Sequence, residues 1–163
     1  MDKNTIPENF TLPLVLVDTI PVIFFTINMI LLGQMFESPL FILGALLCFF
    51  GGAGKVIWKL IVVLKKKNVW FLFIQLRILM PIGFLMILLS LFIQRANLSI
   101  PALVTGFLSM PSFIFFLLGI LGMVLMIIFA KKLDSSDVKS NWIEQLTNGL
   151  SQICIFIGLL FLL

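Results

Sequence analysis

Five charged residues stand within long apolar stretches of this sequence, where a charge is costly. They are Asp18, Lys55, Lys59, Arg77 and Glu144. A charge at the centre of a membrane span costs about 2.5–3.5 kcal/mol on insertion scales, so it normally faces protein or water and has a partner. Acidic and basic side chains in such places form structural ion pairs, bind charged solutes or carry protons. These five residues are therefore the first candidates for chemistry.

The five charges are predicted to lie at one level of the membrane. At a rise of about 1.5 Å per residue, each lies within about two and a half turns of the helix end that is predicted to be cytoplasmic. Because they come from four different helices, they predict an interior polar cluster, with Asp18–Arg77 and Glu144–Lys59 as its pairs. In the alternative interpretation, Lys55 and Lys59 extend to the headgroups and hold anionic lipid. An ion pair of Asp18 and Arg77 could also be purely structural.

A polar stripe is predicted on the last apolar segment. Asn141, Glu144, Gln145, Asn148 and Gln152 recur at spacings of three and four, which places them on one face of a helix. The stripe either lines an aqueous vestibule or forms hydrogen bonds to neighbouring helices, worth about 0.6–2 kcal/mol each. The candidate ligand-binding residues are Asp18, Lys55, Lys59, Arg77, Glu144, Asn148 and Gln152.

Prolines follow two of the charges closely. Pro21 comes three residues after Asp18, and Pro81 comes four residues after Arg77. A proline in a helix frees the carbonyl four residues before it. Freed carbonyls beside charges form ion or substrate sites in broken membrane helices, although ordinary kinks have the same sequence pattern.

Five apolar segments must position these residues, and each is long enough to cross the hydrocarbon core, which needs about 20 residues. The segments are about 12–36, 39–64, 69–93, 100–130 and 142–163. Their links are short, so consecutive segments are expected to be antiparallel. The sequence predicts an all-α polytopic transmembrane helix bundle with five spans, in a single membrane domain over residues 1–163.

The fourth segment is longer than a span needs. Pro101 and Pro111 divide its 31 residues or so. We predict one long tilted helix with a kink at Pro111. In the alternative, the segment is split or its first third is re-entrant, which gives six pieces.

Composition supports a membrane protein, since 61% of the residues are hydrophobic and 11% are charged, whereas a soluble domain has about 25% charged residues. The first apolar segment lacks the basic start and cleavage site of a signal peptide and is predicted to be a retained span. With no histidine, and with Cys48 and Cys154 inside apolar runs, we predict no metal site, no catalytic residue and no cofactor.

The basic residues predict an orientation. One side of the membrane receives Lys3, Lys65, Lys66, Lys67, Lys131, Lys132 and Lys139, and the other receives Arg95. Cytoplasmic loops carry the excess of lysine and arginine. We therefore predict a cytoplasmic N-terminus, an external C-terminus and residence in the plasma membrane.

The leading hypothesis is a small transporter, permease subunit or channel with its site in the cytoplasmic half of the bilayer. Arg77 and Lys55 would attract a small anionic solute, and Asp18 or Glu144 would balance them. The alternative is a non-catalytic subunit, chaperone or regulator that docks to another membrane protein or to a second copy. A membrane-embedded enzyme with Asp18 and Glu144 as acid and base is the third hypothesis. Membrane lipids are expected partners, and nucleic acid is not.

Overall fold

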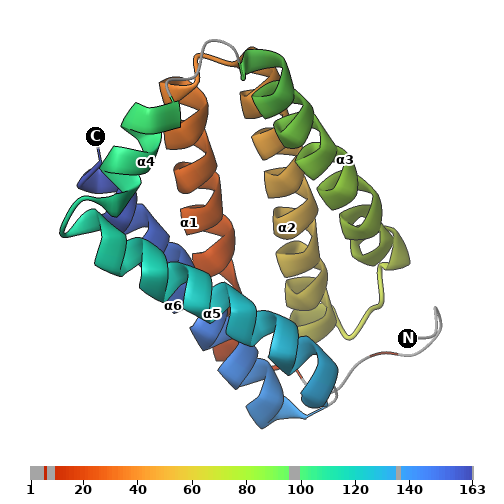
Figure 1. Cartoon of the computed structure of the whole chain (residues 1–163). Helices are drawn as coiled ribbons and strands as arrows, with labels where there is room; N and C mark the ends of the chain where they lie inside the picture. Colours follow the sequence, from red (N-terminus) through yellow and green to blue (C-terminus); the bar gives the residue numbers. More distant parts are fainter. Residues whose placement is uncertain (1–5, 7–9, 96–99, 135–136, 163) are drawn as a thin grey trace.

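The computed structural model describes residues 6, 10–95, 100–134 and 137–162 of the 163-residue chain. These residues form six helices, shown in Figure 1. The helices are α1 (Leu12–Met35), α2 (Pro39–Lys65), α3 (Trp70–Gln94), α4 (Ile100–Leu108), α5 (Ser112–Lys132) and α6 (Val138–Leu160).

Five of these helices are long and apolar enough to cross a membrane: α1, α2, α3, α5 over Ser112–Phe129, and α6. The prediction of an all-α bundle with five spans is confirmed. The remaining helix, α4, has nine residues and reaches only about 14 Å, less than half of a hydrocarbon core. Helix α1 starts at the end of the molecule opposite to the one where α6 finishes (Figure 1).

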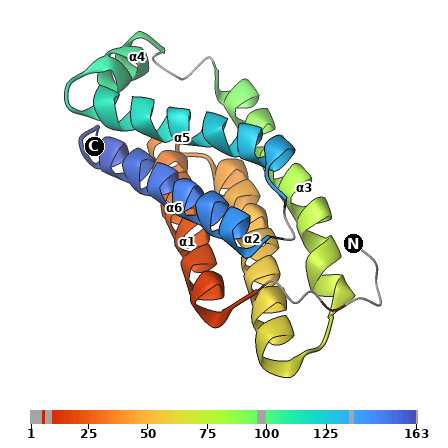
Figure 2. The same cartoon turned by 90° about the horizontal axis from the view of Figure 1, so that it is seen from below.

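The fourth predicted segment consists of two helices, so the prediction of one kinked helix is wrong and the split alternative is confirmed. Helix α4 ends at Leu108 and α5 begins at Ser112. Pro111 has no N–H to donate, and a proline disfavours helical conformation in the residue before it. The Ser109 hydroxyl and backbone N–H both donate to the Gly106 carbonyl, at 2.6 and 3.2 Å. These bonds complete a sharp bend between α4 and α5 (Figure 2).

Helix α1 holds the bundle together. It packs against α2 on one side and α6 on another, while α3 packs on α2 and α5 packs on α6. The chain therefore forms two arms, the α2–α3 arm and the α5–α6 arm, joined at α1. Among the described residues, α1 is the one helix with extensive contacts to both arms.

The prolines inside α1 and α3 do not break these helices. Both helices continue through Pro21 and Pro81. These positions are therefore kinks at most, and the broken-helix interpretation is wrong.

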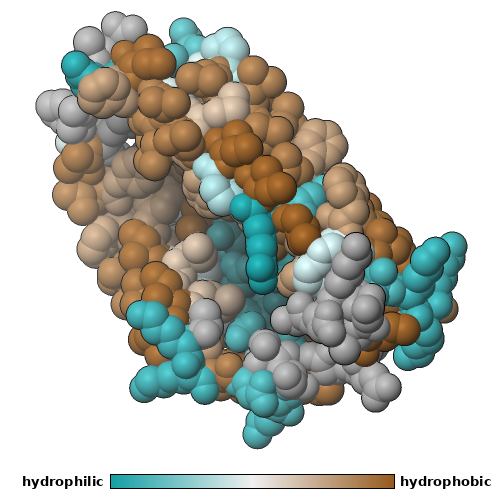
Figure 3. Space-filling view, turned by 90° about the vertical axis from the view of Figure 1, so that its right-hand side faces the viewer, coloured by the Kyte–Doolittle hydropathy of each residue, from teal (hydrophilic) through white to brown (hydrophobic). Residues whose placement is uncertain are grey.

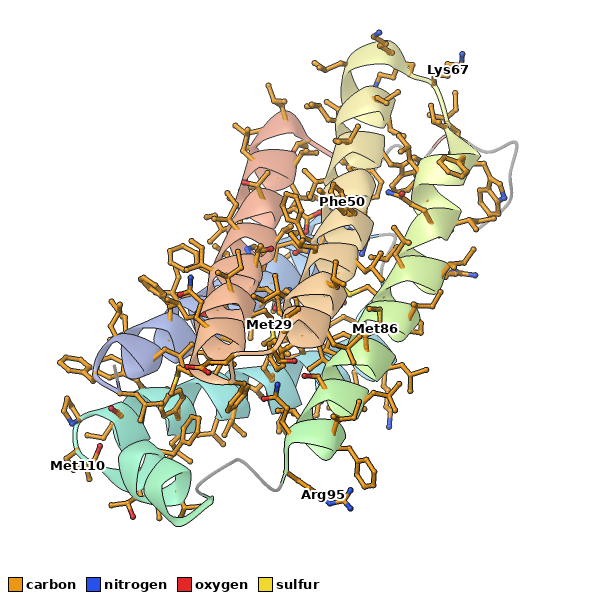
Figure 4. All side chains as sticks on the ribbon, turned by 90° about the horizontal axis from the view of Figure 1, so that it is seen from above. Met29, Phe50, Lys67, Met86, Arg95 and Met110 are labelled. Carbon is orange, nitrogen blue, oxygen red and sulfur yellow. The ribbon has the colours of Figure 1, made fainter. Side chains whose placement is uncertain are left out.

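The two ends of the α2–α3 arm carry some of the basic residues on which the predicted orientation depends. Lys67 lies in the α2–α3 loop, and Arg95 lies at the far end of α3 (Figure 4). The described lysines of the α2–α3 loop are thus separated from Arg95 by the full length of a span.

Candidate functional site

A buried ion pair joins α1 to α2. The Asp18 carboxylate (Oδ2) lies 2.5 Å from the Lys59 ammonium (Nζ). The two residues are 5% and 2% exposed, and the Phe10 ring lies 5.1 Å from the ammonium. Lys59 therefore does not extend to the headgroups. The predicted pairs Asp18–Arg77 and Glu144–Lys59 are wrong, because α1 packs against α2, so that Asp18 on α1 meets Lys59 on α2.

Lys55 lies one turn before Lys59 on α2, and it is half-buried. Lys55 and Ile57 are about 200° apart around the helix, and Lys55 and Leu64 about 180° apart, at about 100° per residue. Since Ile57 and Leu64 are exposed, Lys55 lies on the inner side of the α2–α3 arm.

The polar stripe of α6 also faces the interior. On one side of the stripe, α6 contacts α5, where Ser151 abuts Gly122; on the other side it contacts α1, where Gly149 abuts Ile20. The exposed residues of α6 occupy the opposite face, as Leu150 does with 62% of its surface accessible. Asn141, Gln145, Asn148 and Gln152 lie between the two contacts and point inward. Glu144 lies within about 20° of Ser151 around the helix, on the side that faces α5, at about 100° per residue. Asn141, Gln145 and Gln152 are buried, and Glu144 and Asn148 are half-buried.

A hollow lies between the two arms. Figure 3 shows it with hydrophilic residues inside and hydrophobic residues around it. Two half-buried charged residues belong to opposite arms, Lys55 on α2 and Glu144 on α6. In the described part of the chain, neither residue forms an ion pair.

Arg77 does not join this cluster. Its side chain is exposed on α3, and its guanidinium group lies 5.2 Å from the centre of the Phe73 ring, one turn earlier. Helix α3 is separated from α1 by α2, so an arginine on its exposed side cannot reach Asp18.

Gln152, a predicted ligand-binding residue, joins helices instead. Its backbone carbonyl and its side-chain oxygen accept hydrogen bonds from the Asn28 amide, at 3.0 and 3.2 Å. Its own amide donates to the sulfur of Met123 on α5, at 3.5 Å. One polar side chain thus connects α1, α6 and α5.

Asn28 is a residue that the sequence analysis missed. It is fully buried near the middle of α1. The sequence did contain a signal for Asn28, because an amide side chain in the largely apolar stretch from Ile20 to Leu32 is costly unless it forms a hydrogen bond to another helix.

Among the described residues, no group of three or more Cys, Asp and Glu side chains gathers closely enough to hold a metal ion. The buried or half-buried charges discussed above are the Asp18–Lys59 pair and the side chains of Lys55 and Glu144, which form no ion pair with a described residue. Comparisons with protein-family models, with curated proteins and with solved structures find no match to this chain, so its function has to be argued from this site.

Proposed function

We propose that this membrane protein is a small transporter that binds a small anionic solute at Lys55, in the hollow between its two arms. The observation that carries the proposal is that two lysines on one helix face differ in whether a carboxylate pairs with them. Asp18 neutralises Lys59, whereas the Lys55 ammonium forms no ion pair with any residue that the structure describes. Partial burial of a cation without a partner is costly, and an anion that binds there relieves the cost.

The arrangement of the arms supports movement around a bound solute. Transporters commonly alternate between states by rocking one bundle against another around a site near their interface. Here the two arms share α1 and make their extensive contacts with it rather than with each other. A change in the angle between them would open or close the hollow while the Asp18–Lys59 pair stays intact within the α1–α2 contact.

The lysine distribution supports an orientation for this proposed transporter. With Lys65, Lys66 and Lys67 at the cytoplasmic surface of a plasma membrane, Lys55 lies about two and a half turns above that surface. The solute site would then open first to the cytoplasm.

The test uses the whole chain, purified gently and measured by native mass spectrometry and by thermal unfolding with a panel of small anions. We expect a bound anion, and stabilisation by about 2.7 kcal/mol at a concentration 100 times its Kd. Lys55→Gln should abolish both. Lys66→Gln removes the same charge from an exposed loop and is the matched control. Equal loss in the two variants, or no anion that stabilises the wild-type chain, would contradict the proposal.

A second candidate function, a subunit that docks to another membrane protein, rests on Arg77. This charge is exposed within a span, where an acidic residue of a partner helix would neutralise it. The expected result is a stoichiometric partner in the native mass spectrum that Arg77→Gln removes and Lys55→Gln does not. A chain that carries no second protein before any mutation would exclude this candidate.

A further inference from the structure

A basic surface lies at the end of α3 that adjoins the α2–α3 loop. Lys65, Lys66 and Lys67 are exposed there, and Arg77 is exposed on α3, seven residues after its first residue, Trp70. Because α2 and α3 are both long and apolar enough to cross a membrane, the loop between them lies at a membrane surface. The three lysines therefore lie at the level of the lipid headgroups, and the backbone of Arg77 lies about 10 Å deeper.

The Arg77 side chain extends back toward this loop. Side chains on a helix point toward its N-terminus, and the N-terminus of α3 is the end at the loop. The Arg77 guanidinium group lies 5.2 Å from the centre of the Phe73 ring, which is one turn nearer to the loop. Phe73 in turn contacts Trp70, with 5.1 Å between the ring centres. Arg77 therefore extends its charge toward the headgroups, as long basic side chains near the ends of membrane helices do.

The aromatic residues beside Arg77 also support the loop. The Trp58 indole N–H donates to the side-chain oxygen of Asn68, at 2.9 Å, and Lys67 directly precedes Asn68. The Trp58 ring is buried and lies 5.0 Å from the Phe73 ring. One aromatic ring, that of Phe73, thus contacts both the arginine and the tryptophan that holds the loop. The lysines and Arg77 share this support.

The face of α3 that carries Arg77 is apolar further along the helix. Phe84 and Leu88 lie within about 20° of Arg77 around the helix, at about 100° per residue. Both side chains are exposed. The surface is therefore cationic at the membrane boundary and apolar across the hydrocarbon core. A phospholipid with an anionic headgroup has the complementary groups in the same order.

We propose that this surface binds an anionic phospholipid, whose phosphate contacts Arg77 and the lysines at the loop and whose acyl chain lies along Phe84 and Leu88. A guanidinium group suits a phosphate because it donates two parallel hydrogen bonds. The lysines add charge that favours an anionic headgroup over a zwitterionic one. A partner helix with one acidic residue would account for Arg77 but not for the lysines. The site is independent of the solute site proposed at Lys55.

The experiment uses the purified full-length chain in nanodiscs made from equal amounts of phosphatidylglycerol and phosphatidylcholine. Lipids that stay bound after transfer to detergent are identified by native mass spectrometry. The wild type should retain phosphatidylglycerol in preference to phosphatidylcholine. Arg77→Gln should weaken this retention about fivefold, the contribution of one basic residue near a charged membrane surface. Replacement of Lys65, Lys66 and Lys67 by glutamine should weaken it further.

Arg95→Gln is the matched control. Arg95 is also exposed, and its guanidinium group also lies over a ring, 4.0 Å from the centre of Phe92. It lies at the opposite end of α3 from Lys67 (Figure 4), so its replacement should leave the retention unchanged. Arg77→Lys keeps the charge and should weaken retention less than Arg77→Gln. Each variant is first compared with the wild type in its melting temperature in nanodiscs of phosphatidylcholine alone.

Three outcomes would overturn the proposal. Equal retention of the two lipids by the wild type would show that the surface does not select an anionic headgroup. Equal loss in Arg77→Gln and Arg95→Gln would show that any exposed cation suffices. Displacement of the lipid by soluble glycerol phosphate, or by a stoichiometric protein that Arg77→Gln removes, would assign the surface to another ligand. None of these variants changes Lys55, so the solute site is tested separately.

Discussion

The interface between α2 and α3 and the surfaces that surround α1 are built from different residues. At the first, Gly44 and Gly83 face each other so closely that a Cβ on either would lie 2.6–2.7 Å from the carbonyl oxygen of the other. Around α1, by contrast, the contacts include the Asp18–Lys59 ion pair and the amide bonds of Asn28 to Gln152. The α2–α3 interface combines close backbone packing with one buried hydroxyl pair, Ser38 and Ser90, whereas a charged pair and an amide cross the interfaces of α1.

The two regions differ in the kind of interaction that holds their helices together. Apolar helices gain no hydrophobic stabilisation from each other in lipid, so small residues that allow close van der Waals contact hold them together. The α2–α3 arm is such a unit. Polar groups inside a bilayer are expensive and depend on their partners. The Asp18–Lys59 pair and the Asn28 amide lie at α1, where the two arms meet, whereas Ser38 and Ser90 form a buried hydroxyl pair within the α2–α3 arm. Four changes test this contrast, given from the largest expected effect to the smallest.

Asp18→Asn is expected to have the largest effect, because it leaves the Lys59 ammonium buried and unpaired. Loss of one partner of a buried ion pair costs about 3–5 kcal/mol. The measurement is reversible unfolding of the purified chain in mixed micelles. The double variant Asp18→Leu with Lys59→Met should recover most of the stability, since apolar replacement of a whole buried pair is often neutral. An unchanged melting point for Asp18→Asn would show that Lys59 finds water or another partner.

Gly83→Ala should rank second, because the new methyl group would meet the Gly44 carbonyl and the Cys48 sulfur at 2.6 Å. Backbone atoms cannot move aside, so α2 and α3 must separate, at a cost of about 1–3 kcal/mol. Gly51→Ala is the matched control in the same interface, where the nearest atom would be 3.4 Å away. Alanine favours a helix over glycine, so the control should be neutral or slightly stabilising. Equal destabilisation by both would refute the close-packing explanation.

Asn28→Leu removes the two hydrogen bonds to Gln152 and should cost about 0.6–2 kcal/mol. The loss should weaken contact between α1 and α6 and leave the α2–α3 arm intact. Cross-linking between cysteines placed on α1 and α6 would report it, together with unfolding. Thr26→Val is the control, because the Thr26 hydroxyl bonds to Val22 of its own helix. A larger loss in the control would place the polar contribution within α1 and not between the helices.

The smallest effect is expected at the start of α6, where the Asp137 carboxylate accepts hydrogen bonds from the backbone N–H and the hydroxyl of Ser140, both at 2.9 Å. These bonds lower the pKa of the Asp137 carboxyl below its usual value. Since the folded pKa lies below the unfolded one, the cap stabilises fully above the unfolded aspartate pKa, and its contribution is lost as the pH falls through the lowered pKa.

Hydrogen exchange of the first turn of α6 checks this prediction across the acid range. Exchange corrected for its intrinsic pH dependence should accelerate on acidification in the wild type. Asp137→Asn keeps a capping oxygen but cannot titrate, so its corrected exchange should not change with pH. The same acid response in both variants would assign the fraying to another group.

The sequence predicted that charged residues of different helices come together, but not which of them pair. The helical rise alone puts Asp18 and Lys59 at similar depth, and the structure joins them in an ion pair. Depth says nothing about neighbours, however. Arg77 lies at a similar predicted depth and is exposed, because α3 packs on the far side of α2.

The sequence by itself determined that the chain is an all-α membrane protein with five spans, because hydrophobicity and the length needed to cross a bilayer are properties of each segment alone. Only the tertiary structure decided that Asp18 pairs with Lys59, that Asn28 bonds to Gln152, and that the fourth segment bends into α4 and α5. These outcomes depend on which helix faces approach each other. That choice follows from close packing at small residues such as Gly44 and Gly83, which no single segment can specify.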